Sequence, residues 1–312
     1  MRKTTFAIVG TGIVGERIIN QLLANERAEI LTLFDEHNER LAEMSNTYGL
    51  NAASSFEEVL LMKPDWVYIG TPPVSHAILS EKVIEAGLNV LCEKPLAHDV
   101  KDGAIMAEAA KKSTIQTAMH FPLMYSPAVR HMMKLVEKGA VGNIERVELC
   151  TYLPHWPRLW QQNPWIGSRE QGGFTREIFP HYFQLMYRMF GHVSILNHHT
   201  TYPTDQALAE IGVLAIGETE NKVPLLVNGL SGIGQEEELS YIVYGSEGVL
   251  KLRNWSELSM SLKDSTFELL TSFENVKTLV EECIAAAQGE ESLLVPFSEG
   301  LEVQKLIDIL LT

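Results

Sequence analysis

A glycine-rich turn near the N-terminus has the spacing that binds the phosphates of a dinucleotide. The apolar run 5–9 leads into the turn, and apolar residues at helical spacing follow it, so it joins a predicted strand to a predicted helix. The first glycine permits a tight turn, the second lets the backbone approach a pyrophosphate, and the third lets the helix pack on the strand. Free N–H groups at the start of the helix would bind the phosphates. The predicted phosphate-binding residues are Gly10, Thr11, Gly12, Ile13, Val14 and Gly15.

An acidic residue ends the second predicted strand, 20 residues after the last glycine of the turn. This residue, Asp35, follows the apolar run 30–34. An acid at this place binds the ribose hydroxyls of the adenosine and repels a 2′-phosphate, and Glu36 adds to the repulsion. Because no arginine follows immediately, the sequence favours NAD over NADP. A glycine turn alone also occurs without a ligand, so the prediction depends on strand, turn, helix and acid together.

Two further polar motifs follow predicted strands. They are Thr71-Pro72-Pro73, after the apolar run 66–69, and Glu93-Lys94-Pro95, after the run 89–92. Ligands of open parallel sheets bind at the carboxyl edge of the strands. Pro95 keeps Lys94 out of helical geometry, and a lysine beside a nicotinamide could donate a proton or a hydrogen bond to a substrate oxygen. A lone lysine is more often a surface charge, so its position is what favours function.

A second candidate group lies in the second half of the chain, in the segment 171–181 (QGGFTREIFPH). Glu177 and His181 are four residues apart and would share one face of a helix. A carboxylate beside an imidazole can orient the ring and favour its charged form. Pro180 fits only if it falls in the first turn of that helix. Taken alone, His181 would by default be a structural histidine.

The elements that must position these residues change character near residue 120. Before it, short apolar strands alternate with helices, which predicts a doubly wound parallel α/β sheet. After it, longer strand-like segments with few helices predict an α+β domain on a mostly antiparallel sheet. We therefore expect a dinucleotide-binding domain at 1–120 and a substrate-binding and oligomerisation domain at 121–312. The later strands are expected near 144–153, 207–215, 222–230, 239–244 and 249–255, and helices near 127–138, 174–190 and 298–311.

The composition excludes several classes of partner. The net charge of the 312-residue chain is −15, and no basic cluster offsets it, which argues against nucleic acid and anionic membranes. No apolar run is long enough to span a bilayer. Three cysteines cannot form a disulfide framework and indicate a reducing, cytoplasmic setting. The sequence singles out no set of metal ligands.

Taken together, these motifs give the chain a form that resembles the Gfo/Idh/MocA family, that of glucose–fructose oxidoreductase and inositol dehydrogenase. The resemblance covers nearly the whole length. It is carried by the glycine loop, Thr71-Pro72-Pro73 followed by His76, the run 86–96 (AGLNVLCEKPL), the Gly-Gly…His segment, and 244–250 (YGSEGVL). The Glu-Lys-Pro run with its upstream Ala-Gly is the most specific of these.

The resemblance implies a Rossmann domain followed by a domain on a large sheet whose outer face makes homodimer or homotetramer contacts. It implies hydride transfer between NAD and a small substrate of the sugar or polyol kind, with His181 taking or giving the hydroxyl proton and Lys94 bonding the oxygen. Glu177 would stand behind His181 as a third catalytic residue. The predicted cofactor-binding residues beyond the glycine loop are Asp35, Thr71, Pro72, Pro73, His76, Glu93 and Lys94.

Several residues depart from the family pattern. Glu177 stands where an aspartate is usual, Phe179 replaces a glycine and could fill space that a sugar would occupy, and Arg176 replaces an apolar residue. Arg176 could bind a substrate carboxylate or phosphate, although an ion pair with a nearby acid is the more ordinary explanation. Trp160 and Trp165 could stack on a substrate ring or hold a long loop onto the sheet. The Asn/Arg stretch of the family reads Phe-Pro-Leu-Met-Tyr-Ser-Pro at 121–127.

Three functions are therefore compared. The first is a cytoplasmic NAD-dependent dehydrogenase or reductase acting on a small hydroxyl or carbonyl substrate. The second is an NAD-binding sensor of the same fold without turnover, which the altered 176–179 segment favours. The third is redox-assisted glycoside cleavage. The sequence does not name the substrate or the direction of hydride transfer.

Overall fold

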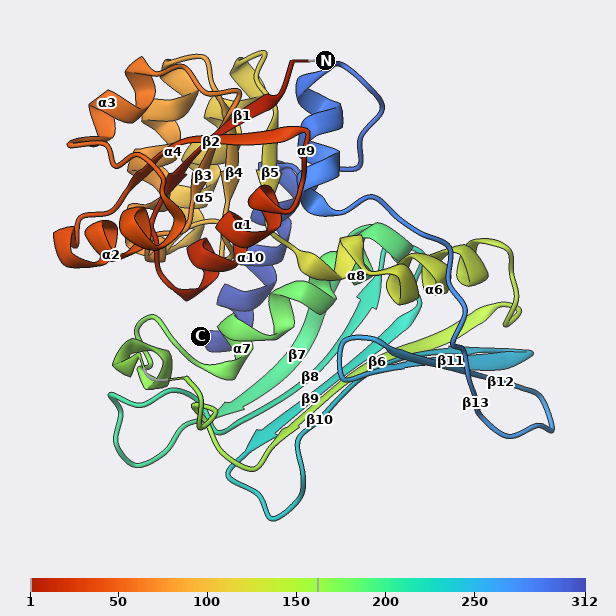
Figure 1. The fold of residues 1–312 in the computed structure, drawn as a ribbon. Helices are drawn as coiled ribbons and strands as arrows, with labels where there is room; N and C mark the ends of the chain where they lie inside the picture. The colour runs from red at the N-terminus through yellow and green to blue at the C-terminus, as the bar shows by residue number, and fades with distance from the viewer. Residues whose placement is uncertain (1, 162) are drawn as a thin grey trace. The chain divides into compact units, whose positions relative to one another are not determined.

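The computed structural model describes residues 2–161 and 163–312 (Figure 1). The chain forms two compact units. The first contains the residues up to Phe121 and the segment Lys277–Gln304, and the second contains Pro122–Val276 and Lys305–Thr312. Each unit is built on its own sheet. None of the described helices is both long and apolar enough to cross a lipid bilayer.

A parallel sheet of five strands is the frame of the first unit. Its strand order is β2-β1-β3-β4-β5, so β2 lies on one side of β1 and the later strands lie on the other. A parallel bridge between Leu33 and Ala52 adds a short pairing outside β2. The order reverses between β1 and β3, and parallel sheets bind ligands at such a point, beyond their carboxyl ends. The strands are β1 (Thr4–Val9), β2 (Ala28–Phe34), β3 (Trp66–Ile69), β4 (Asn89–Cys92) and β5 (Thr117–Met119).

Helices connect these strands, and their ends follow local sequence signals. Asp99 caps the fifth helix by accepting from the backbone N–H groups of Lys101 and Asp102. Ser55 caps the third by accepting from the N–H of Glu58 at 3.1 Å. These helices are α1 (Ile13–Leu23), α2 (Asn38–Tyr48), α3 (Phe56–Leu61), the 3₁₀ turn η1 (Pro73–Ser75), α4 (His76–Glu85) and α5 (Val100–Lys112).

The central strands of this sheet are buried on both faces. Every residue of β3 is buried, and so is every residue of β1 except Thr5. Strands of this kind appear in the sequence as continuous apolar runs rather than alternating ones. The predicted doubly wound parallel sheet is confirmed.

The segment Lys277–Gln304 packs with the first unit, although the sequence placed it with the second half. The indole Nε1 of Trp66 in β3 donates to the carbonyl of Cys283 at 2.8 Å. The backbone N–H of Met119 in β5 donates to the carbonyl of Val295 at 2.7 Å. Two helices that follow an antiparallel sheet carry no sequence mark of which unit they join, so the predicted division at residue 120 misplaces them. They are α9 (Leu279–Ala287) and the first part of α10 (Phe297–Leu311).

The second unit has an eight-stranded sheet of order β13-β12-β11-β10-β6-β9-β8-β7. Its neighbours pair antiparallel, except that β6 and β9 are parallel, as predicted for a mostly antiparallel sheet. The strands are β6 (Ile144–Leu153), β7 (Val193–Thr201), β8 (Gly212–Thr219), β9 (Pro224–Ser231), β10 (Glu238–Gly245), β11 (Gly248–Arg253), β12 (Glu257–Leu262) and β13 (Glu268–Leu269). The helical segments are η2 (Pro122–Tyr125), α6 (Pro127–Glu137), η3 (Pro164–Gly167), α7 (Phe174–Glu177) and α8 (Phe179–Phe190).

The two faces of this sheet differ in their surroundings. On the inner face, a Cβ added to Gly229 of β9 would lie 2.6 Å from the ring of Phe174 and 2.9 Å from that of Phe179, so the aromatic side chains of α7 and α8 rest directly on the strand. On the outer face, large apolar side chains are exposed. In β8, Val213 and Ala215 are buried, whereas Leu214 and Ile216 are each 53% exposed.

Candidate cofactor and active site

In the glycine loop between β1 and α1, Gly10 and Gly15 are closely packed, whereas Gly12 faces open space. Gly10 has a φ of 92°, and a Cβ on it would lie 2.6 Å from the carbonyl carbon of Gly70. A Cβ on Gly15 would lie 2.1 Å from the carbonyl oxygen of Gly10. A Cβ on Gly12, the residue that precedes α1, would meet no atom within 4 Å. The loop therefore leaves open space at the one glycine where a pyrophosphate must approach the backbone, and the residues fit a dinucleotide.

Asp35, at the end of β2, anchors this loop. Its Oδ2 accepts from the backbone N–H of Thr11 at 2.7 Å and from the Thr11 hydroxyl at 2.9 Å. Its Oδ1 accepts from the N–H of His37 at 2.9 Å. A carboxylate has about four lone-pair sites, so these bonds leave capacity for a ribose hydroxyl. Asp35 thus holds the loop in addition to the ribose contact predicted for it.

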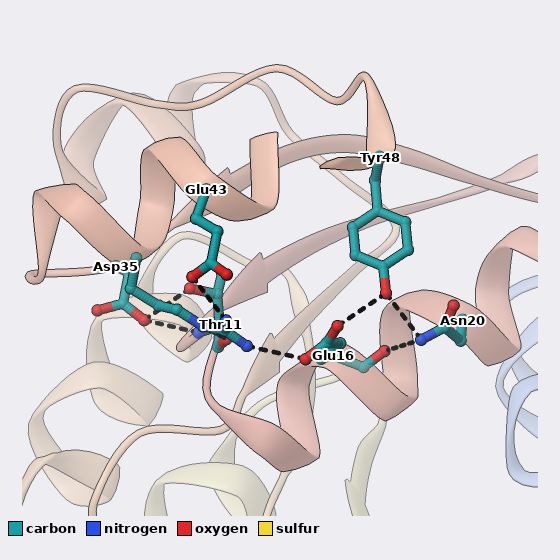
Figure 2. Close-up of polar contacts among 7 residues, drawn as sticks. Thr11, Glu16, Asn20, Asp35, Glu43 and Tyr48 are labelled. Carbon is teal, nitrogen blue, oxygen red and sulfur yellow. Dashed lines mark hydrogen bonds and ion pairs between the residues drawn. The ribbon is translucent and has the colours of Figure 1, made fainter. Parts of the chain in front are cut away.

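Arg40, which the sequence reasoning did not single out, belongs to the same network. Figure 2 shows labelled residues of this network, with Thr11 beside Asp35 and Glu16 beside Tyr48. From α2 its Nε donates to the carbonyl of Thr11 at 2.9 Å, and its terminal nitrogens donate to Glu16 and Glu43 at 2.8 Å each. Glu16 also accepts from the hydroxyl of Tyr48 at 3.0 Å. No arginine lies immediately after Asp35, but the first turn of α2 brings Arg40, five positions after it, back to the loop.

The turns after β3 and β4 are joined by His76. One ring nitrogen, Nε2, lies 2.8 Å from the carbonyl oxygen of Thr71, and Nδ1 lies 3.0 Å from that of Pro95. The ring is fully buried, and burial lowers the pKa of His76 although both carbonyls oppose this. A buried ring between two turns supports both of them, and a direct contact of His76 with a cofactor stays a prediction.

Glu93 is buried and bonded to two side chains that the sequence reasoning missed. Its Oε1 accepts from the hydroxyl of Tyr68 in β3 at 2.9 Å and lies 2.5 Å from Nδ1 of His120, the residue after β5. Burial alone would raise the pKa of Glu93, but His120, Tyr68 and Lys94 together hold it below its usual range. Tyr68 lies within an apolar run, so its sequence context does not mark it as a site residue. His120 directly follows a strand, as Glu93 does, and this position is the signal that could have found it. Lys94 is half-buried and comes directly after Glu93.

In the second unit the predicted helix 174–190 is two helices. α7 ends at Glu177 and α8 begins at Phe179, with Ile178 between them at φ −111° and ψ −50°. Pro180 has no N–H to bond the carbonyl of Arg176, so a continuous helix cannot cross this point. Pro180 falls in the first turn of α8, as its presence requires. Glu177 and His181 therefore lie on different helices, which corrects the argument that they share one helical face.

His181 is buried, and its ring meets an aromatic side chain from a distant strand turn. The ring centroids of His181 and Trp255 are 5.3 Å apart at an interplanar angle of 79°. Trp255, in the turn between β11 and β12, also stacks on Tyr182 at 5.5 Å. The contact with Trp255 restricts the orientation of the His181 imidazole, and a catalytic role of His181 stays a prediction.

Known proteins match both parts of the chain. Residues 4–121 match an oxidoreductase family described as having an NAD-binding Rossmann fold, and residues 129–251 match the GFO/IDH/MocA C-terminal domain. The chain belongs to the Gfo/Idh/MocA family of oxidoreductases. This confirms the resemblance on which the sequence analysis relied.

Individual members of the Gfo/Idh/MocA family are distant. Inositol 2-dehydrogenase of Rhizobium meliloti is 20% identical over 97% of this chain and 94% of its own length. An uncharacterised oxidoreductase of Streptococcus pneumoniae is 29% identical over 54% of this chain. Oxidoreductase P35 of Formosa agariphila is 24% identical over 61% of this chain. The chain spans only 45% and 62% of the lengths of these last two proteins.

Solved structures share the fold over almost the whole chain. A putative NADPH-dependent oxidoreductase of Desulfitobacterium hafniense superposes with a TM-score of 0.89 at 15% identity, covering 100% of this chain and 95% of that one. A levoglucosan dehydrogenase in complex with NADH gives 0.84 at 19% identity, covering 99% and 96%. At these identities the likeness establishes the fold.

The residues that depart from the Gfo/Idh/MocA pattern have clear structural partners. A terminal nitrogen of Arg176, Nη1, donates to the carbonyls of Arg169 and Gly172 at 3.0 and 3.1 Å. These bonds hold the loop before α7, and a contact of Arg176 with a substrate anion or with an acid stays a prediction. Phe179 is fully buried, with its ring 5.7 Å from that of Phe174 and 6.1 Å from that of Phe183.

Glu210 is a further buried residue beside this loop. Its Oε1 accepts from the N–H of Thr175 at 2.7 Å, and burial raises the pKa of the Glu210 carboxyl. A Cβ on Gly173 would lie 2.3 Å from its Oε2, so this glycine, at a φ of 102°, leaves room for the acid. Gly173 of the motif thus has a structural role in this chain.

The structure gives one tryptophan of the segment 154–169, Trp156, a role in holding the loop. Trp156 Nε1 donates to the carbonyl of Ile166 at 3.2 Å, and its ring lies edge-on to Phe174 at 6.2 Å, which fastens the loop. Trp165 is half-buried, and Trp160 is 58% exposed. A stacking role on a substrate stays a prediction for Trp160 and Trp165.

Proposed function

We propose that this protein is an NAD-dependent dehydrogenase or reductase that moves a hydride between nicotinamide and a carbon–oxygen bond of a small sugar- or polyol-like substrate. The observation that carries the proposal is the carboxyl edge of the first sheet. There, open space at Gly12 and the carboxylate of Asp35 fit a dinucleotide, and the same edge carries Lys94 two strands away from β1. Relatives named as dehydrogenases of inositol, apiose and levoglucosan support the substrate class.

The chemistry is divided between the cofactor and three side chains of this chain. Bound NAD would supply the hydride acceptor, or as NADH the donor. Lys94 would donate a hydrogen bond to the reacting oxygen and stabilise negative charge there. His181, held by Trp255, would accept the hydroxyl proton during oxidation and return it during reduction. Glu177 would take the place of the family aspartate.

The direct test is turnover with a substrate panel. Purified protein is incubated with NAD and, one at a time, with sugars, inositols and hydroxy acids, while NADH is followed by its absorbance. We expect NADH formation with at least one polyol or sugar. Tight NAD binding without turnover of any substrate in either direction would contradict the enzymatic proposal and favour the sensor. Release of sugar from glycosides by protein that retains NAD would favour redox-assisted cleavage.

The sensor alternative depended on the altered 176–179 segment. Arg176 bonds backbone carbonyls and Phe179 is buried among aromatic rings, so both residues have structural explanations. The reason to expect a blocked substrate site is correspondingly weaker, and the enzyme is the function that we propose.

We also infer a preference for NAD over NADP, and predict that it depends on the charge of Asp35. NADH should bind more tightly than NADPH, because the carboxylate would lie beside a 2′-phosphate. Asp35→Asn keeps an acceptor for Thr11 but removes the charge. It should lower the ratio of the NADPH Kd to the NADH Kd about tenfold, which corresponds to ~1.4 kcal/mol. Titration calorimetry with both reduced cofactors measures this.

The matched control for Asp35 is Glu43→Gln, which removes a carboxylate that bonds Arg40 rather than the loop. Asp35→Asn with an unchanged preference, or a wild type that prefers NADPH, would contradict the inference. In the second case Arg40 would be the residue to examine, because a guanidinium is suited to binding a phosphate.

We propose that the outer face of the eight-stranded sheet joins two copies of the chain, in a homodimer or homotetramer. Leu196, Leu214, Ile216 and Leu230 lie on the neighbouring strands β7, β8 and β9, and each is more than two-fifths exposed. Ile216→Glu should convert the oligomer to a monomer in light scattering, because each C₂ interface would bury the new charge twice. Lys112→Glu on α5 is the control. A monomeric wild type would contradict the proposal.

Cytoplasmic location also stays a prediction, which cell fractionation would test.

A further inference from the structure

The turn between β11 and β12 (Figure 1) carries a tryptophan in a backbone conformation that suits other residues better. Its two central residues, Asn254 and Trp255, have φ angles of 45° and 73°, both in the left-handed region. The N–H of Ser256 donates to the carbonyl of Arg253 at 3.1 Å and closes the turn, and Arg253 pairs with Glu257 across the two strands. Glycine and asparagine are usual at such positions, whereas a bulky residue with a positive φ is an outlier. Asn254 follows this rule, and Trp255 breaks it.

The turn is fastened to the neighbouring strand β10 by its asparagine. The N–H of Asn254 donates to the carbonyl of Leu239 at 3.0 Å, and the side-chain oxygen of Asn254 accepts from the N–H of Leu239 at 3.4 Å. These bonds set the place of the turn and would serve equally with glycine at position 255. A strained residue persists where its surroundings hold it, and such residues are concentrated at functional sites. The reason for a tryptophan at position 255 must therefore be sought in the contacts of its ring.

The indole of Trp255 ends a row of three aromatic rings. Tyr241 of β10 stacks on Tyr182 of α8, with ring centroids 6.0 Å apart and an interplanar angle of 29°. Tyr182 in turn stacks on Trp255, at 5.5 Å and 30°. The two tyrosines are fully buried, whereas Trp255 is half-buried. The row begins in the close-packed sheet, so it holds the plane of the indole although the turn itself lies at the surface.

The imidazole of His181 meets this held indole edge to face. The two ring centroids are 5.3 Å apart, and the planes are at 79° to each other. Aromatic rings prefer such an arrangement, and its energy depends on the orientation of both rings. His181 and Tyr182 are consecutive residues of α8, so one indole contacts both. A ring whose plane is fixed from the sheet thus favours one orientation of the histidine ring.

We propose that Trp255 is a positioning residue for the reaction, and that the chain keeps the unfavourable backbone of this turn because it brings the indole to His181. This inference rests on the proposed function, in which His181 moves the hydroxyl proton. An acid or base acts only within hydrogen-bond reach of the proton that it transfers, and a displacement of about 1 Å can lower a rate about 10²-fold. The indole acts through the imidazole, without contact with the substrate.

Kinetics with the panel substrate that is turned over fastest test this role. Trp255→Gly suits the backbone but removes the ring, and it should lower kcat about 10- to 100-fold. The KM of the substrate should change less than about threefold, because the lost contact acts on the proton transfer and not on binding. Trp255→Phe keeps a ring beside the imidazole and should recover most of the lost kcat. A rise in KM with kcat unchanged would mean that the indole binds the substrate directly, and would overturn the positioning role.

A second measurement does not depend on turnover. NMR of protein with isotope-labelled histidine follows the ring of His181, whose signal is assigned by its absence from His181→Asn. Removing the indole in Trp255→Gly should move or broaden this signal, because the ring current of Trp255 and its restriction of the imidazole are both lost. Trp255→Phe should move it less. A His181 signal that is unchanged in Trp255→Gly would overturn the inference.

The matched control for the backbone is Asp264→Gly. Asp264 also has a positive φ, of 63°, and it is exposed in the turn that follows β12. This substitution relieves the same kind of backbone conformation without removing an aromatic ring, so kcat and the His181 signal should stay those of the wild type. Thermal unfolding checks the fold of Trp255→Gly. If that variant is unstable, Trp255→Leu, which keeps an apolar side chain but no ring, decides the outcome and should lower kcat similarly.

The outcomes separate this inference from the proposed function. A wild type that turns over no member of the panel in either direction overturns the proposed function, and the inference with it. A wild type that turns over a substrate, together with a Trp255→Gly variant that is folded and retains kcat, overturns only the inference. Equal losses of kcat in Trp255→Phe and Trp255→Gly would also overturn it, because a ring at this place would then not be what matters.

Discussion

Replacing Lys94 with alanine should lower kcat by about 10²–10⁴-fold, the usual contribution of a positioned acid or hydrogen-bond donor. Lys94 follows β4 between buried Glu93 and the turn that His76 supports through Pro95. Its backbone is therefore set by contacts that the substitution leaves in place. The loss should fall on kcat and on kcat/KM together, because the interaction that is removed strengthens as charge develops on the substrate oxygen. The Kd of NADH should change only a few-fold.

The measurement for Lys94 needs a matched lysine and a second substitution. Lys101→Ala on the exposed face of α5 removes an equal charge from the same unit and should keep wild-type kinetics. Lys94→Arg restores the charge with a larger, planar group, and it should recover only part of the activity if position matters. If Lys94→Ala raised KM alone and left kcat unchanged, Lys94 would bind substrate without taking part in the reaction step.

The first unit could be predicted closely because its signals are local. Continuous apolar runs gave strands buried on both faces, and the glycines and Asp35 were placed by their distance from those runs. What could not be predicted depends on contacts between distant segments. Arg40 reaches the glycine loop because α2 folds back on it, and His120 meets Glu93 because β5 lies beside β4. Neither pairing has a sequence spacing of its own.

The second unit was predicted less well, for related reasons. The strand Val193–Thr201 was missed because its sequence, VSILNHHTT, lacks the apolar alternation of a half-buried strand. The break at Ile178 was missed because helical spacing of the apolar residues continues across it, and only the absent N–H of Pro180 signals the interruption. The role of motif residues such as His181 was predicted from the family resemblance alone, because periodicity gives no guide to it.

Gly12 and Gly15 should respond to alanine in opposite ways, although they are three residues apart in one loop. A methyl group on Gly15 would lie 2.1 Å from the carbonyl oxygen of Gly10, which is backbone and cannot rotate away. Gly15→Ala should therefore destabilise the first unit by about 1–3 kcal/mol, as an overpacked core position does. Thermal and urea unfolding without added cofactor measure this loss.

Gly12→Ala, in contrast, should leave stability without cofactor unchanged and weaken NADH binding at least about tenfold. Its φ of −65° and ψ of −170° suit any residue, and its Cβ would meet no protein atom within 4 Å. The added methyl group would occupy the space that a pyrophosphate needs, so the cost would appear only when the cofactor binds. Each variant is the control for the other, because one changes unfolding and the other changes the Kd measured on folded protein. If Gly12→Ala bound NADH as tightly as the wild type, the open space at this loop would not be the phosphate site, and the proposed function would lose the observation that carries it.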